Sequence, residues 1–183
     1  MPSTLAADAT GGVGALPTWI VALAPEASVV GPALTVTIGL DDNSPMADVA
    51  SRGPDPGTVL VVAGGAESRT AILGDLLARE LLAAGVAAVV TDGLIRDSRA
   101  VAALGLPVWA RGVSPVASRK SGHGWIGGGV LLAGVPVRDG DLVIADADGV
   151  VVWPADATAE LIEKAEAKQR ADDERLARLL QHR

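Results

Sequence analysis

Gly57-Thr-Val-Leu-Val-Val-Ala63, Leu76-Leu-Ala-Arg-Glu-Leu-Leu-Ala-Ala84 and Val86-Ala-Ala-Val-Val-Thr91 are the three runs of sequence that decide the fold. The first and third are short apolar runs bounded by turn residues, which is typical of buried strands. The middle run reads as a helix, and Gly85 stands where a left-handed residue would end it. A strand, a helix and a strand of these lengths predict parallel strands joined by a right-handed crossover, and so an α/β fold.

The segments on either side extend this pattern. Residues 33–40 alternate apolar and threonine side chains and predict a strand with one buried face. Short helices are expected at residues 44–51 and 98–104, and a strand at residues 106–109. Further along, turn signals that include Asp-Gly pairs separate three β-like runs, which predicts antiparallel or mixed pairing among residues 129–137, 141–145 and 150–153.

The whole chain, residues 1–183, is predicted to form one domain. Residues 1–30 are expected to form an N-terminal helical arm, with Ser3 and Thr4 available to cap a helix over residues 3–9. Residues 155–183 predict one C-terminal helix, and 25 residues of helix would be about 38 Å long. Two interpretations of this helix stand side by side: a solvated surface helix, or an arm that packs on a neighbouring subunit.

Composition excludes several classes of function. The chain is 49% apolar, but Gly and Pro interrupt every apolar run before it reaches the ~18 residues of a membrane span. With no Cys there is neither a disulfide nor a thiolate metal site, and the absence of a secretion signal makes the cytoplasm the expected location. The net charge of −7, without any basic stripe, argues against a nucleic-acid partner.

The turn before the central helix is a candidate anion site. Gly74 can make the turn and Asp75 can cap the helix, which leaves the amides of Leu76 and Leu77 without intrahelical acceptors. Free amides at a helix N-terminus bind anions, so a carboxylate-bearing substrate fits here. The side chains of Leu76 and Leu77 are expected to pack inward.

Arg96-Asp97 follows the strand at residues 86–91, at the end where open α/β sheets bind ligands. Arg96 offers a planar fork for a carboxylate, and Asp97 a hard oxygen for Mg²⁺. One protein carboxylate is enough if water and a 2-keto acid complete the coordination shell. The alternative is structural: Asp97 and Asp75 would cap helices, and Arg96 would be a surface ion-pair residue.

The run Gly74-Asp75-Leu76-Leu77, followed after twenty residues by Arg96-Asp97, resembles the RraA-like family, which includes the 4-hydroxy-4-methyl-2-oxoglutarate aldolases. Gly31-Pro32-Ala33 and the run from Gly140-Asp141 to Val151 are similar as well, so the resemblance covers nearly the whole chain. It implies a β/β/α swivelling-domain fold with a long C-terminal helix. It also implies a homotrimer or a dimer of trimers, with active sites between subunits.

The activity that the resemblance implies is that of a class II pyruvate aldolase, a lyase that uses Mg²⁺ or Mn²⁺ and often decarboxylates oxaloacetate. In this family pattern Asp97 holds the cation, and Arg96 stabilises the keto oxygen as it becomes the pyruvate enolate. The turn at Gly74 and the amides of Leu76 and Leu77 hold the carboxylate of the small 2-keto acid. Asp75 orders metal-bound water that relays protons.

Two other functions stay open at this point. Founding members of the family regulate RNase E by binding it, but they lack the full Arg-Asp pair that this sequence keeps. A paralogue acting on another small keto or hydroxy acid would share the same site. Among other residues, His123 either contacts a substrate or is incidental, and Asp92 either holds a turn or supports Arg96.

Overall fold

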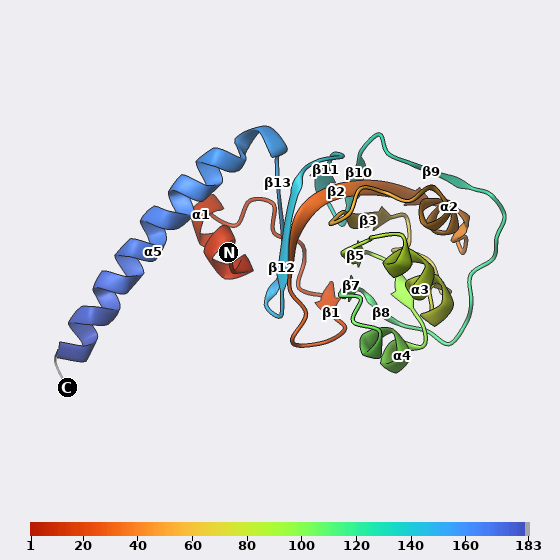
Figure 1. Cartoon of the computed structure of the whole chain (residues 1–183), viewed down its shortest axis with the longest axis horizontal. Helices are drawn as coiled ribbons and strands as arrows, with labels where there is room; N and C mark the ends of the chain where they lie inside the picture. The colour runs from red at the N-terminus through yellow and green to blue at the C-terminus, as the bar shows by residue number, and fades with distance from the viewer. Residues whose placement is uncertain (182–183) are drawn as a thin grey trace.

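The computed structural model describes residues 1–181, and its centre is a mixed eight-stranded sheet (Figure 1). The strands follow the order β1-β7-β5-β3-β2-β12-β13, and β9 also pairs with β2. Their bounds are Val21–Ala22 (β1), Val29–Ile38 (β2), Val59–Ala63 (β3), Ala88–Thr91 (β5), Val108–Ala110 (β7), Gly124–Ile126 (β9), Leu142–Asp146 (β12) and Gly149–Trp153 (β13).

The parallel centre of this sheet confirms the predicted strand–helix–strand unit. Strands β3 and β5 are parallel, with Val61 opposite Val90, and β2 and β7 extend the parallel set on either side. Leu60 and Val62 face one hydrophobic cluster, while the alternating residues of β3 face another. Both faces of β3 are therefore buried, which explains its uninterrupted apolar sequence.

Three helices cover one face of the sheet (Figure 1). They are α2 (Ser44–Arg52), α3 (Asp75–Ala83) and α4 (Ser98–Ala103), close to the predicted positions. On the other face, Leu16 and Ile20 pack with the hairpin formed by β10 (Val130–Leu132) and β11 (Val135–Val137). The prediction of one continuous strand at residues 129–137 is wrong, because Ala133, with φ of 49°, and Gly134 turn the chain back.

A second sheet, which the sequence did not indicate, lies beside the first. It is a three-stranded parallel sheet in the order β4-β6-β8, formed by Ala71–Leu73, Leu94–Ile95 and Gly112–Val113. Each strand has only two or three residues. This small sheet positions the candidate site.

The N-terminal and C-terminal helices lie together on the outer side of β12 and β13 (Figure 1). Helix α1 (Ser3–Thr10) follows Pro2, which occupies the N-cap position, so Ser3 and Thr4 do not cap it as predicted. Instead, the amide and hydroxyl of Ser3 donate to Asp146, at 2.7 and 2.5 Å. The rest of residues 1–30 contains β1 and the start of β2.

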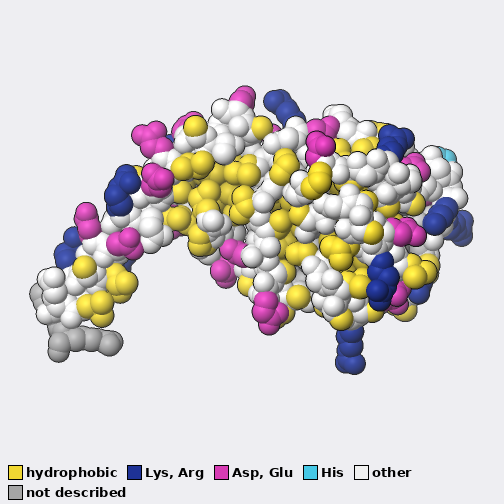
Figure 2. Space-filling view, in the orientation of Figure 1, with side chains coloured by type: hydrophobic (Ala, Val, Ile, Leu, Met, Phe, Trp, Pro, Cys, Tyr) yellow, Lys and Arg dark blue, Asp and Glu magenta, His cyan; other side chains and the backbone are white. Residues whose placement is uncertain are grey.

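Helix α5 (Thr158–Gln181) follows a short 3-10 turn, Ala155–Ala157, and projects from the body of the protein (Figure 1). Leu161 and Ala165 are buried, whereas hydrophobic side chains near its far end stand open to solvent (Figure 2). Residues 182–183 of the predicted helix lie outside the described residues. Between residues 1 and 181, no helix combines the length and the apolar character needed to cross a membrane.

Candidate active site

The carboxyl edge of the small sheet gathers the residues of the candidate site. Because β4, β6 and β8 are parallel, the residues that follow them emerge at one edge: Gly74-Asp75, Arg96-Asp97 and Ser114-Pro115. The sequence placed Arg96-Asp97 after the strand at residues 86–91, and this is wrong. Asp92-Gly93 follows β5, and β6 intervenes before Arg96.

One pocket of about 260 Å³ brings all six predicted site residues together. The backbone turn at the start of α3 forms one wall and the loop after β6 forms another. Five further residues complete it, so the full lining consists of Asn43, Ala71, Gly74, Asp75, Leu76, Leu77, Arg96, Asp97, Ala117, Ser118 and Lys120.

Arg96 and Asp97 form an ion pair, with Arg96 Nε donating to Asp97 Oδ2 at 2.9 Å. Both side chains are partly exposed, at 39% and 34%. Asp97 precedes α4 but its carboxylate makes no capping hydrogen bond, and its backbone is left-handed, with φ of 53°. Left-handed backbone at a residue other than glycine costs free energy and is concentrated at functional sites. Of the structural alternative, the side-chain cap is therefore absent, although Asp97 occupies the N-cap position of α4, whereas the partly exposed ion pair of Arg96 is present.

Gly74 allows the two halves of the site to approach each other. A Cβ atom at this position would lie 2.9 Å from Asp97 Oδ2 and 3.0 Å from Arg96 Cγ, closer than side chains pack. Gly74 is also the N-cap residue of α3, and Asp75 is the first helical residue, without a side-chain capping bond. The prediction that Asp75 caps α3 is thus wrong, and its carboxylate remains on the pocket wall.

The first turn of α3 presents backbone donors to the pocket. The backbone hydrogen bonds of α3 begin with the amide of Ala78, which donates to the carbonyl of Gly74 at 2.9 Å. The amides of Leu76 and Leu77 come before this bond and therefore have no acceptor within the helix. Leu77 packs against the core as expected. Leu76 is 72% exposed, because Ala78 and Leu81 form the buried face of the helix, so the prediction that it packs inward is wrong.

The oxygen ligands that the site offers to a divalent cation are few. Within residues 1–181, no group of three or more His, Cys, Asp or Glu side chains is arranged to hold a metal. Asp97 uses only Oδ2 in its ion pair, so Oδ1 is available as a hard oxygen ligand. Mg²⁺ commonly takes one or two carboxylates and completes its shell with water and substrate oxygens, so the residues fit.

The loop at residues 114–123, hereafter the pocket loop, lines the site although its sequence does not indicate this. It contributes Ala117, Ser118 and Lys120 to the pocket, so the lining contains a second basic residue in addition to Arg96. The basic pair Arg119-Lys120 marks the loop as a candidate anion-binding segment, but it does not indicate that the loop reaches this pocket. His123 does not line the pocket: its ring is 77% exposed and lies 3.6 Å from Asp42.

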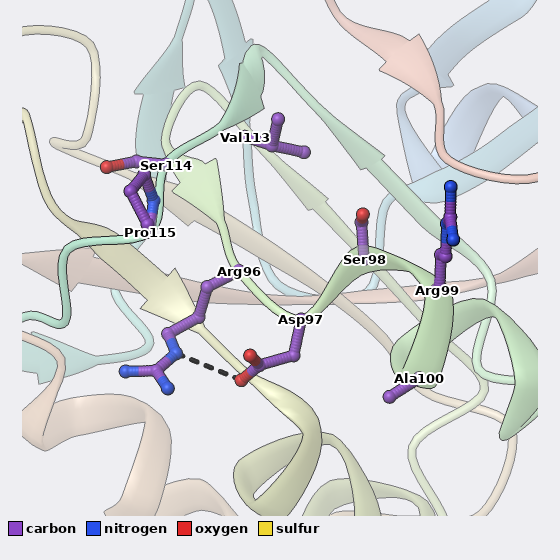
Figure 3. Close-up of a pocket in the computed structure, with 8 residues that line it drawn as sticks. All are labelled: Arg96, Asp97, Ser98, Arg99, Ala100, Val113, Ser114 and Pro115. Carbon is purple, nitrogen blue, oxygen red and sulfur yellow. Dashed lines mark hydrogen bonds and ion pairs between the residues drawn. The ribbon is translucent and has the colours of Figure 1, made fainter.

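A wider and more open hollow of about 740 Å³ adjoins the pocket across the Arg96-Asp97 pair. The start of α4 and the end of β8 form its walls. Figure 3 shows the guanidinium of Arg96 turned toward Asp97, while the side chains of Ser98 and Arg99 point away from this ion pair. The pair therefore lines both hollows.

The carboxyl edge of the large sheet is closed by its own polar groups. Asp92 accepts a hydrogen bond from the amide of Gly65 at 2.8 Å. Burial raises the pKa of its carboxyl, although the hydrogen bonds from the amides of Gly65 and Gly64 and the charge of Arg111 act in the opposite direction. Arg111 donates to the carbonyls of Ser68 and Asp92, at 2.7 and 3.1 Å. Asp92 thus holds a turn, and it is not bonded to Arg96.

Comparison with known proteins gives the family context of this site. Residues 6–152 match the family model described as "RraA-like: Aldolase/RraA". Over 174 residues the chain is 40% identical to a protein of Halalkalibacterium halodurans named "Putative 4-hydroxy-4-methyl-2-oxoglutarate aldolase", covering 95% of this chain and 82% of that protein.

Two solved structures share the fold. Streptomyces coelicolor RraAS2, described as an unusual member of the RNase ES inhibitor RraA protein family, has a TM-score of 0.84 at 31% identity, covering 97% of this chain and 93% of that chain. The RNA-processing inhibitor RraA from Thermus thermophilis has a TM-score of 0.76 at 30% identity, covering 84% and 93%. The predicted RraA-like α/β fold with a long C-terminal helix is confirmed.

Proposed function

This chain belongs to the RraA-like family, and on that premise we propose that it is a divalent-metal-dependent pyruvate aldolase that also decarboxylates oxaloacetate. The names of its curated relatives indicate an aldolase, which is a carbon–carbon lyase. The observation that carries the proposal is the single pocket that joins Asp75, the start of α3, Arg96 and Asp97. Its substrates would be adducts of the type of 4-hydroxy-4-methyl-2-oxoglutarate.

The pocket matches a small keto acid with two carboxylates. The amides of Leu76 and Leu77 would hold the carboxylate next to the keto group, because helix N-termini favour anions. Arg96 would face the keto oxygen. Lys120, on the pocket loop, supplies the charge for the second carboxylate. These cations and amides orient the bond to be broken relative to Arg96.

In the proposed aldol cleavage the bond between C3 and C4 of the substrate breaks. The C4 hydroxyl gives up its proton, C4 becomes the carbonyl of the released keto acid, and the electron pair passes to C3. The charge delocalises onto the C2 keto oxygen as an enolate, where the Arg96 guanidinium stabilises it. Protonation of C3 gives pyruvate, and Asp75 is the pocket carboxylate that moves the protons.

Asp97 is the residue that would hold Mg²⁺ or Mn²⁺, through the oxygen that does not bind Arg96. When bound there, the cation supplies Lewis-acid stabilisation of negative charge on the keto oxygen. Asp97 itself also fixes the direction of the Arg96 side chain through their ion pair.

We also propose that the protein is a homo-oligomer, either a trimer or a dimer of trimers. The far end of α5 exposes Leu176, Leu179 and Leu180, each between 56% and 63% accessible. Three leucines at this spacing form one apolar stripe that a neighbouring subunit would cover. Light scattering of the full chain, compared with a chain ending at residue 170, tests this proposal.

Pyruvate release from 4-hydroxy-4-methyl-2-oxoglutarate and from oxaloacetate tests the proposed reaction. Each substrate is assayed with Mg²⁺, with Mn²⁺ and with a chelator. We expect metal-dependent release that the chelator abolishes and that added metal restores. No release above background on either substrate, with or without metal, would overturn the proposal.

The alternative function is regulation of an RNase E-type ribonuclease. Its support is the similarity to one structure described as an RNA-processing inhibitor and to another described as an unusual member of the RNase ES inhibitor family, together with a net charge of −7 suited to a basic protein segment. Inhibition of RNA cleavage by such a ribonuclease, measured with the wild-type chain and with Arg96→Ala, separates the two functions. Inhibition that persists in the variant, without any lyase activity in the wild type, would favour the regulator.

A further inference from the structure

We propose that Asp42 is a positioning residue that clamps the pocket loop and thereby holds Lys120 over the candidate site. The role in substrate binding rests on the proposed function, whereas the clamp itself is a property of the fold. Asp42 lies just after β2 and is almost fully buried, with only 1% of its side chain exposed.

Both oxygens of Asp42 are engaged, and they bind different segments. Oδ1 accepts from the amide and hydroxyl of Ser44, at 2.8 and 2.6 Å, which fixes the start of α2. Oδ2 accepts from the amides of Ser121 and His123, at 3.0 and 2.9 Å. Asp42 therefore ties the end of the pocket loop to the rigid core.

The hydroxyl of Ser44, which donates to Asp42, also binds the pocket loop directly. The amide of Gly122 donates to Ser44 Oγ at 3.0 Å, so three consecutive amides of the loop end on the Asp42–Ser44 pair. Ser44 is the first residue of α2 and is followed by the buried residues Pro45 and Met46. This pair of residues forms the clamp.

The pocket loop is also paired along its middle, which places Lys120 between two fixed points. The amide of Ala71 donates to the carbonyl of Val116 at 2.7 Å, and the amide of Arg119 donates to the carbonyl of Asp41 at 2.7 Å. Lys120 follows directly, immediately before the clamped residues. The carbonyl of His123 also accepts the amide of Gly39 at 3.0 Å, so loosening the clamp would weaken the attachment on one side of Lys120 and increase the mobility of the segment that carries this cation.

Asp42 is suited to this role because it stays charged. Burial by itself would raise the pKa of its carboxyl, but the hydrogen bonds from Ser44, His123 and Ser121 lower it to about 2. Hydrogen bonds to an ionised acceptor are about twice as strong as those between neutral groups. The clamp is thus at full strength at neutral pH.

Asp42→Asn and Asp41→Asn form a matched pair that tests the clamp. An asparagine at position 42 has one acceptor oxygen, so it can serve Ser44 or the loop amides but not both. All three side-chain bonds of Asp41 go to its Oδ1, so an asparagine there can keep them. The two variants remove the same charge, but only Asp42→Asn disturbs side-chain hydrogen bonds to the pocket loop.

Limited digestion with trypsin reads the loop directly, because Arg119 and Lys120 are exposed cleavage residues within it. We expect the rate of cutting at these two positions, identified by mass spectrometry, to rise about tenfold or more in Asp42→Asn and less than about threefold in Asp41→Asn. Equal cutting rates in Asp42→Asn and the wild type would overturn the clamp.

Kinetics then test the connection to Lys120. In Asp42→Asn, KM for oxaloacetate should rise about tenfold, whereas proton exchange at the methyl group of pyruvate, which has one carboxylate, should change less than about twofold. Equal loss on both would overturn the positioning role. A wild-type chain without any turnover or exchange would overturn the proposed function, and the trypsin comparison would still decide on the clamp.

Ser44→Ala covers the case in which Asp42→Asn does not fold. It removes only the hydroxyl that donates to Asp42 and accepts from Gly122. Cutting at Arg119 and Lys120 should then rise about threefold. A rate unchanged from the wild type would count against the clamp.

Discussion

The two parallel sheets of this protein end in different ways. At the carboxyl edge of the large sheet, the side chains of Asp92 and Arg111 are hydrogen-bonded to neighbouring backbone groups, so they are not available to a ligand. At the carboxyl edge of the small sheet, Asp75 and one oxygen of Asp97 have no side-chain hydrogen bond within the part of the chain that the structure describes. Ligands of open α/β sheets bind beyond the carboxyl ends of strands, and here only the small sheet leaves that position open.

The polar groups at the two edges have different roles, one set stabilising the fold and the other being available for a reaction. Polar groups at the large edge are satisfied by the protein and stabilise the fold, because leaving them unpaired would cost free energy. Polar groups at the small edge are partly exposed and available to a substrate. Substitutions at the two edges should therefore have distinct consequences, and the following experiments probe that distinction.

The largest effect is expected at the small edge, for Arg96→Ala and Asp97→Ala. Loss of a group that stabilises developing charge should lower kcat by about 10²–10³-fold while the melting temperature is kept. Arg79→Ala, on the exposed side of α3, is the matched control and should retain activity. Wild-type rates in both site variants would show that this edge is not the active site.

Gly74→Ala should act on the same edge indirectly. The added Cβ would displace Asp97 and Arg96, and a displacement of a few tenths of an ångström to 1 Å can lower kcat by about ten- to a hundredfold. Gly112→Ala is the control within the same sheet, since a Cβ there meets only a side-chain atom of Leu94 at 3.5 Å. Steady-state kinetics of the two variants should differ clearly, and equal rates would contradict the close-approach argument.

Arg111→Ala probes the large edge. Its guanidinium donates to three backbone carbonyls, so its removal should lower the free energy of unfolding by about 2–3 kcal/mol. At a temperature where the variant is still folded, kcat should stay within a few-fold of the wild type. Urea denaturation and steady-state assays check both parts. A large loss of kcat without a loss of stability would erase the distinction between the edges.

The smallest expected effect is the pH dependence of stability from Asp42. Its pKa in the folded protein, about 2, lies below the unfolded value of 3.8, so its stabilisation is present above about pH 4 and is lost as the pH falls toward 2. The shift corresponds to about 2 kcal/mol. Urea unfolding of the wild type and Asp42→Asn should show a difference at pH 7 that shrinks between pH 4 and pH 2.5. A difference that stays constant would contradict the assigned pKa.

The long elements and the site residues could be predicted from sequence, but the geometry that joins them could not. The apolar runs of β3 and β5 are long enough to be recognised as buried strands. Gly85, with a positive φ, correctly indicates where the helical segment of α3 ends. Strands β4, β6 and β8 have two or three residues each, too few for any periodicity to be read. That is why Arg96-Asp97 was assigned to the wrong sheet.

The same limit explains why Lys120 was missed. Its place in the pocket depends on hydrogen bonds between the pocket loop and distant residues, among them Ala71 and Asp42. No local pattern in a loop rich in Gly and Ser encodes such contacts. The sequence leaves open whether His123 contacts a substrate, and in the structure its ring is exposed while its amide donates to Asp42.

The residues proposed to break the bond and the residue proposed to bind the far end of the substrate lie on separate segments of the chain. Groups proposed for bond cleavage lie at residues 74–77 and 96–97, whereas the cation proposed to select the far end of the substrate lies on one continuous segment, residues 114–123. Exchanging that segment between relatives, with Asp42 and Ser44 kept as its attachment point, should therefore transfer substrate preference while the bond-breaking apparatus is retained.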